Sequence, residues 1–134
     1  MTDPNRYANG DSAEYWAAAA EGRLVFQTCA ACGAVQFPPR HHCATCWQED
    51  LSWTESAGRG TVESVTIVRR APLPAFRDKV PYAVAAVTMG EGPRMIAAIV
   101  GDDALETAIG DPVAVEFRPD DAGTVLPVFR RAPA

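Results

Sequence analysis

Two observations in the sequence predict a mainly β protein. Two Cys-x-x-Cys pairs lie within residues 29–46, and each pair can form a tight turn that offers two thiolates to one metal ion. From Gly58 onward, stretches rich in Val, Thr and Ile alternate with turn residues, a pattern typical of short strands. We therefore predict an N-terminal helical segment over residues 1–22, a rubredoxin-like zinc ribbon over 23–57 and a five-stranded OB-fold barrel over 58–134.

In the N-terminal segment, the alanine-rich sequence AEYWAAAAE predicts one short helix over residues 13–21, with Asp11 or Ser12 as its N-cap. A helix of this length is unstable on its own in water. We therefore expect Tyr15 and Trp16 to dock it on another surface, which could belong to this chain or to another protein.

The four cysteines, Cys29, Cys32, Cys43 and Cys46, are predicted to bind one structural Zn²⁺ per chain. Four thiolates fill a tetrahedral shell, so such a site holds the fold and leaves no position open for water or substrate. Gly33 follows the second cysteine and permits the positive φ that the first turn requires.

Other uses of the cysteines are open at this point. A mononuclear iron site of the rubredoxin type has the same four ligands. A thioredoxin-like redox pair needs only one Cys-x-x-Cys at a helix start, which disfavours it here. His41 or His42 could replace Cys43 as a ligand, although we expect both histidines to flank the metal or to support its ligands.

The barrel strands follow from runs of alternating or β-branched residues after Gly58. Pro127 lies inside the last run and marks it as an edge strand or a bulge. A short stretch that breaks the alternation predicts one or two helical turns between the third and fourth strands, which is the element order of an OB-fold. The predicted strands are 61–70, 82–89, 94–100, 113–117 and 124–130, and the helical turns are 102–109.

No catalytic constellation is recognisable. A closed cysteine site leaves no free thiol as a nucleophile, and the two histidines are adjacent and lie between the cysteine pairs. The carboxylate pairs Asp102-Asp103 and Asp120-Asp121 occupy turn or cap positions, where we expect solvated side chains. The sequence therefore predicts no catalytic residue and a chain that is not an enzyme by itself.

The predicted ligand or partner contact is the connection between the first two barrel strands, residues 71–81, because this loop borders the binding face of many OB-folds. Three prolines predict an extended segment, from which Phe76, Arg77 and Lys79 would project an aromatic ring and two cations. The net charge of −5 disfavours a nucleic-acid partner, which would need a basic groove.

The N-terminal residues lack the apolar core of a signal peptide, and no apolar stretch approaches the roughly 20 residues of a membrane span. We therefore expect a cytoplasmic protein without a membrane partner.

The chain resembles a known family, the acyl-CoA-associated zinc-ribbon/OB-fold proteins, formerly catalogued as a domain of unknown function. The resemblance covers nearly the whole chain and is most specific in the knuckle CAACGAVQFPPRHHCATC. It continues through GRGTVESVTIVRRAP, YAVAAVTMGEGPRM and GDPVAVEFRPDDAGTVLPVF. One departure is Ala44, where the family often has proline.

The resemblance implies a non-catalytic accessory subunit of a heteromeric enzyme of lipid metabolism that processes acyl-CoA. The implied partners are thiolase-like subunits, including lipid-transfer-type aldolases and acyltransferases, or hydratase-like subunits, with acyl-CoA at a shared interface. Only the four cysteines carry over from the family as site residues. Two alternatives are a single-stranded nucleic-acid-binding ribbon/OB module and a free-standing acyl-CoA-binding protein.

Overall fold

The computed structural model describes residues 7–133. The chain divides into two compact units. The first unit comprises the chain up to Ala57 together with Glu91–Pro93 and Phe117–Pro127, and the second comprises the remaining segments from Gly58 onward. The cysteine motif therefore lies in the first unit, and most of the β-rich half forms the second.

Helix α1 spans Ala13–Ala20, close to its predicted range. Ser12 is the N-cap by position, but its hydroxyl bonds the backbone of Asn9 instead of capping the helix. Tyr15 is buried and packs on Phe37, with ring centroids 5.4 Å apart, so the helix docks within its own unit. No helix in residues 7–133 is long and apolar enough to cross a membrane.

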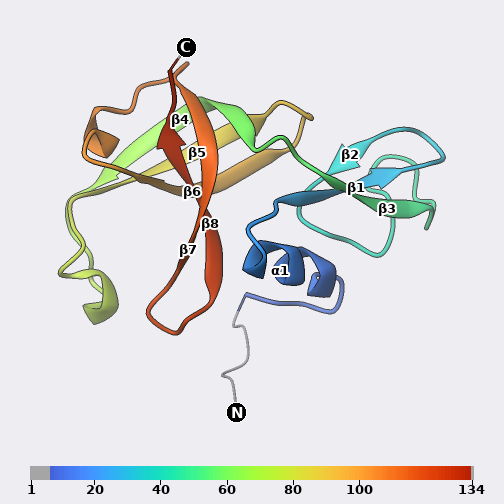
Figure 1. Cartoon of the computed structure of the whole chain (residues 1–134), viewed down its shortest axis with the longest axis horizontal. Helices are drawn as coiled ribbons and strands as arrows, with labels where there is room; N and C mark the ends of the chain where they lie inside the picture. The colour runs from blue at the N-terminus through green and yellow to red at the C-terminus, as the bar shows by residue number, and fades with distance from the viewer. Residues whose placement is uncertain (1–6, 134) are drawn as a thin grey trace. The chain divides into compact units, whose positions relative to one another are not determined.

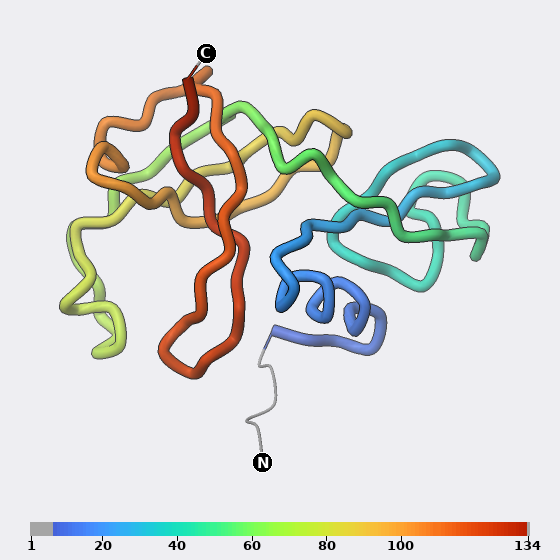
Figure 2. The backbone as a smooth tube through the Cα atoms, in the orientation of Figure 1, coloured from blue at the N-terminus to red at the C-terminus, as the bar shows by residue number. Residues whose placement is uncertain are grey.

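The cysteine motif is built on a three-stranded antiparallel sheet of order β2-β1-β3. Its strands are β1 (Val25–Cys29), β2 (Val35–Gln36) and β3 (Leu51–Glu55). Figure 2 shows the chain leaving β1, looping out twice and returning along β3. Strand β2 was not predicted, because two residues carry no periodic signal.

The second half forms a closed five-stranded barrel of order β4-β5-β6-β8-β7, visible in Figure 1. Strand β4 pairs antiparallel with β5 and β7, β5 pairs antiparallel with β6, and β6 pairs parallel with β8. This order, with the third and fifth barrel strands parallel, is that of the predicted OB-fold. The strands are β4 (Arg59–Val68), β5 (Tyr82–Met89), β6 (Arg94–Val100), β7 (Pro112–Pro119) and β8 (Val125–Arg131).

The barrel core follows from strict alternation along β5, where every second residue from Ala83 to Met89 is buried. Phe129 of β8 is fully buried and is one of the largest side chains in the core. Gly60 of β4 lies so close to β5 that an added Cβ would stand 2.5 Å from Val87 Cγ1. A residue without a side chain is therefore needed where these two strands meet.

Most predicted bounds differ from the structure by one or two residues, and three segments differ in a way that needs an explanation. Strand β4 begins at Arg59 and ends at Val68, two residues earlier than predicted at each end. The helical turns expected at 102–109 reduce to one 3-10 turn, η2 (Ala104–Glu106). The connection expected to be extended contains another 3-10 turn, η1 (Pro74–Phe76), because proline also suits the first position of a helical turn.

Pro127 lies in β8, but β8 is not the edge strand that the proline predicted, because it lies between β6 and β7 in the closed barrel. Pro127 comes before the residues that pair with β6, which are Phe129 and Arg130. Its missing N–H therefore interrupts no bond of that ladder.

Candidate metal centre and contact loop

The structure brings the four predicted cysteine ligands together. All four Sγ atoms lie within 4.8 Å of one another, and the pairs Cys29–Cys46 and Cys32–Cys43 are each 3.6 Å apart. Four sulfurs at about 2.3 Å from a central Zn²⁺ would stand about 3.8 Å from one another. The donor set therefore fits one tetrahedral ion with only small movements.

The two cysteine turns have the same backbone hydrogen-bond pattern. In the first, Cys29 N–H donates to Ala34 O and Gly33 N–H donates to Cys29 O. In the second, Cys43 N–H donates to Gln48 O and Trp47 N–H donates to Cys43 O. We call these two turns the first and second knuckle.

Both knuckles need a left-handed residue directly after their second cysteine. Gly33 has φ 79°, as the sequence predicts, and Trp47 has φ 65° at the equivalent position. A non-glycine residue in this region carries a conformational cost. The second knuckle therefore contains backbone strain that the first avoids.

Backbone N–H groups and neighbouring thiols shift the pKa values of the cysteines in opposite directions. The N–H groups of Cys46 and Thr45 lower the pKa of Cys43 to about 6, against the opposing effect of burial. The N–H of Gln48 lowers the pKa of Cys46, but burial and the neighbouring thiols raise it further, to about 12. Cys43 therefore loses its proton more readily than Cys46, and a bound cation would compensate the charge of the thiolates.

A pair of glutamine side chains supports the second knuckle. Gln27 is buried in β1, where its Oε1 accepts from Gln36 Nε2 and Arg40 N–H, and its Nε2 donates to Arg40 O. Gln36 Oε1 in turn accepts from Ala44 N–H, next to the third cysteine. These bonds connect the excursion between the knuckles to the sheet.

The predicted contact residues lie together on the loop between β4 and β5. Phe76 is half-buried and packs against Tyr82, with centroids 6.1 Å apart, while Arg77 and Lys79 are exposed. Lys79 Nζ lies 5.5 Å from the Phe76 ring centroid, and Arg77 donates to Pro72 O. Their role in contacting a ligand or partner stays a prediction.

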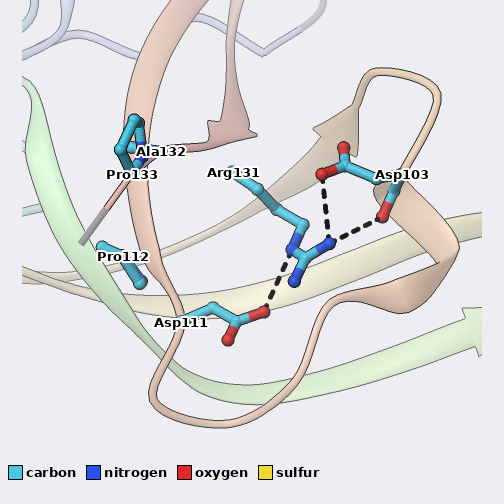
Figure 3. Close-up of a pocket in the computed structure, with 6 residues that line it drawn as sticks. All are labelled: Asp103, Asp111, Pro112, Arg131, Ala132 and Pro133. Atoms are coloured by element: carbon cyan, nitrogen blue, oxygen red, sulfur yellow. Dashed lines mark hydrogen bonds and ion pairs between the residues drawn. The ribbon is translucent and has the colours of Figure 1, made fainter.

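A hollow of about 400 Å³ lies beside the end of β8, and Figure 3 shows the charges in it. Arg131 Nε is 3.1 Å from Asp111 Oδ2, and its Nη1 is 3.1 Å from Asp103 Oδ2. Asp103 is therefore paired, where the sequence predicted a solvated side chain. These charges bind one another and hold the η2 segment to β8.

Sequence reasoning missed two parts of the first unit. Gln27 could have been noticed as a polar residue inside the apolar run LVFQ, but its partners lie up to 13 residues away. The carboxylate of Glu91 accepts from Ser56 Oγ and Ala57 N–H, more than 30 residues earlier in the chain, and no local signal predicts this pair.

Two family models match the chain in sequence order. One is described as the rubredoxin-like zinc ribbon domain of ChsH2 and matches residues 16–52, and the other as the C-terminal OB-fold domain of ChsH2 and matches residues 53–118. Together with the clustered sulfurs, they confirm the predicted fold class and the zinc-ribbon metal site.

Similar proteins fall into two groups. A probable enoyl-CoA hydratase alpha subunit from Thermomonospora curvata is 39% identical over 129 residues, which is 96% of this chain but 40% of that protein. A DUF35 domain-containing scaffold protein from Methanothermobacter thermautotrophicus is 36% identical over 96 residues, 71% of each chain. The chain thus spans about 40% of the length of the hydratase subunit.

A solved structure titled Ltp2-ChsH2(DUF35) aldolase contains a chain similar to this one. The match covers 96% of this chain and all of the other, at 38% identity and with a TM-score of 0.84. The similarity therefore extends over ribbon and barrel together.

Proposed function

The chain belongs to the DUF35 family of ChsH2-type zinc-ribbon and OB-fold proteins, and from this premise we propose that it is a non-catalytic accessory subunit of a heteromeric enzyme that processes acyl-CoA thioesters. The observation that carries the proposal is the match over the full length of a chain in an aldolase complex. The name of the similar hydratase subunit also refers to an acyl-CoA thioester, enoyl-CoA.

The partner in this proposal is a thiolase-like or hydratase-like subunit that brings the catalytic residues. The chemistry of the described residues agrees with a non-catalytic role for this chain beside a catalytic partner. The four thiols are grouped as metal ligands, and the hollow beside β8 contains charges that pair with one another.

In the metal site we propose Zn²⁺, held by Cys29, Cys32, Cys43 and Cys46. Bound there, the ion cross-links the two knuckles and contributes folding free energy. Elemental analysis of purified protein should give about one zinc per chain. If the analysis found about one iron per chain instead, and the protein had the colour of an iron–thiolate centre, the proposal of zinc would be wrong.

Purification of the tagged chain from its native host tests the subunit role. We expect a stoichiometric partner of thiolase or hydratase fold, and acyl-CoA turnover by the complex but not by the chain alone. A chain that stays alone, and binds acyl-CoA or single-stranded nucleic acid by itself, would overturn the proposal.

We place the acyl-CoA contact of this chain at Phe76, Arg77 and Lys79. Residues 69–82 contain four cations and one carboxylate in an otherwise acidic chain, which suits an anionic nucleotide. Replacing Arg77 and Lys79 together by alanine should raise the KM of the complex for acyl-CoA about tenfold, with kcat little changed. Arg59→Ala is the control, since Arg59 is an exposed arginine on β4 outside this loop. An unchanged KM in the double variant would remove this loop from the acyl-CoA site.

A further inference from the structure

The strongest unassigned group of metal-binding side chains is His41, His42 and Glu49. Their donor atoms all lie within 4.8 Å of one another. His41 Nε2 is 2.6 Å and His42 Nε2 is 3.5 Å from the same carboxylate oxygen, Glu49 Oε1. All three side chains are exposed, so a cation can reach them without displacing a packed residue.

The second knuckle brings these residues together. His42 and Glu49 flank the second knuckle, and the bonds between Cys43 and Gln48 and between Trp47 and Cys43 close the turn that separates them. The backbone of His42 is also fixed, because its carbonyl accepts from Gln36 Nε2. The donors are thus held by the folded knuckle and need only side-chain rotation to adjust.

The separations suit a first-row metal ion. Ligands at about 2.1 Å from such an ion stand about 3.0 Å apart in an octahedron and about 3.4 Å apart in a tetrahedron. The two His–Glu separations of 2.6 and 3.5 Å bracket this range. Two imidazoles and one carboxylate form a donor set that binds divalent first-row metals and leaves coordination positions open.

The surrounding charge favours a cation. A hollow lined by His41 and Glu49 also contains Asp11 and Glu14, with Arg40 as the one opposing cation in that lining. A filled cysteine site adds a net charge of about −2 beside it, from four thiolates and one Zn²⁺.

From this geometry we propose that His41, His42 and Glu49 form a second metal site, for a divalent first-row cation, on the surface of the zinc knuckle. It is distinct from the cysteine site in ligand type and exposure. The open coordination positions are available to water or to a side chain of another protein.

The test is a titration of the full chain, already loaded with one Zn²⁺, with Ni²⁺. After removal of unbound metal, elemental analysis should find about one nickel in addition to about one zinc per chain. The absorption spectrum should lack thiolate-to-nickel charge-transfer bands, because the new ligands are nitrogen and oxygen.

Variants separate the two sites. His41→Ala combined with His42→Ala, and separately Glu49→Gln, should lose the bound nickel while keeping the zinc and an unchanged thermal melting profile. Asp50→Asn is the matched control, because it removes the neighbouring exposed carboxylate and should keep both metals. The proposal is overturned if no nickel binds, if nickel binds only by releasing zinc, or if the double histidine variant binds it as well as the parent chain.

Discussion

At the residue scale, the two knuckles show how one backbone requirement is met by two different residues. Gly33 and Trp47 occupy equivalent positions after the second cysteine of each pair, and both have positive φ. Glycine adopts this conformation at little cost, whereas an L side chain is disfavoured there. Replacing Gly33 should therefore give the first knuckle the conformational cost that the second already carries at Trp47.

Gly33→Ala should destabilise the chain by about 1–2 kcal/mol and weaken zinc binding by about tenfold or more. An added Cβ would meet no atom within 4 Å, so the effect is conformational and not steric. Denaturant unfolding and zinc competition with a chromophoric chelator measure it. Gly10→Ala is the control, since that site is equally open and has no positive φ; an equal loss in both variants would contradict the backbone explanation.

Gln27 is the second residue whose role depends on its surroundings. Its side chain is buried and accepts two hydrogen bonds while donating a third. A buried donor that loses its acceptor costs about 1–3 kcal/mol, more than the net gain from forming the bond.

Gln27→Met keeps the side-chain volume but leaves the Arg40 N–H without its acceptor and the Gln36 amide with the His42 carbonyl as its remaining one. We expect zinc affinity to fall at least about tenfold, because the segment leading to the second knuckle loses its attachment to β1. Gln48→Met, at an exposed glutamine, should leave the affinity unchanged. Equal affinities for parent and Gln27→Met would show that packing alone positions the knuckle.

At the element scale, the turn between β5 and β6 is bonded to the residues that follow β3. Partial burial raises the pKa of Glu91, but hydrogen bonds from Ala57 N–H, the Ser56 hydroxyl and its own N–H outweigh this and lower the pKa below 4.5. Because the folded pKa is lowered, the ionised carboxylate stabilises the fold above about pH 4.5. That contribution is lost as the pH falls through the folded pKa.

Glu91→Gln should therefore destabilise the chain at neutral pH by about 1 kcal/mol, a charge-assisted contribution reduced by solvent. Below the folded pKa of Glu91 the parent and the variant should become equally stable. Urea unfolding of both proteins from pH 7 to pH 3 measures the difference, and the bound metal is measured at each pH because its release would itself unfold the ribbon. A difference that persists at the acid end would mean that the carboxylate charge is not what stabilises this turn.

The elements that the sequence predicts best are those with a strong local pattern. Strands β5 and β6 have the predicted bounds, 82–89 and 94–100, because alternation and the Gly-Glu-Gly-Pro turn define both ends. The cysteine spacing likewise predicts the ribbon. Strand β2 and the 3-10 turns are too short for periodicity to resolve, and the Gln27 and Glu91 bonds join residues distant in sequence. What the sequence could not predict is therefore side-chain pairing between elements.

At the scale of the whole molecule, the two units have different means of stabilisation. The barrel has a continuous apolar core drawn from β4 to β8, including Val62, Val87, Val113 and Phe129. The ribbon has a three-stranded sheet and one short helix, with Phe26 and Tyr15 as its largest buried aromatic residues. A small module with so little apolar core depends on a metal or a disulfide for stability.

Removal of the metal should therefore unfold the ribbon and leave the barrel folded. Hydrogen exchange should show that the amides of β1 and β3 lose protection after chelation, while those of β4, β5 and β6 keep theirs. Cys43→Ser should reproduce this pattern without a chelator, and added zinc should restore protection in the parent chain only. If the barrel amides lost protection together with those of the ribbon, the units would form one cooperative fold and zinc would stabilise the whole chain. If the ribbon amides stayed protected, the small apolar core would suffice and the cysteine site would have no structural role.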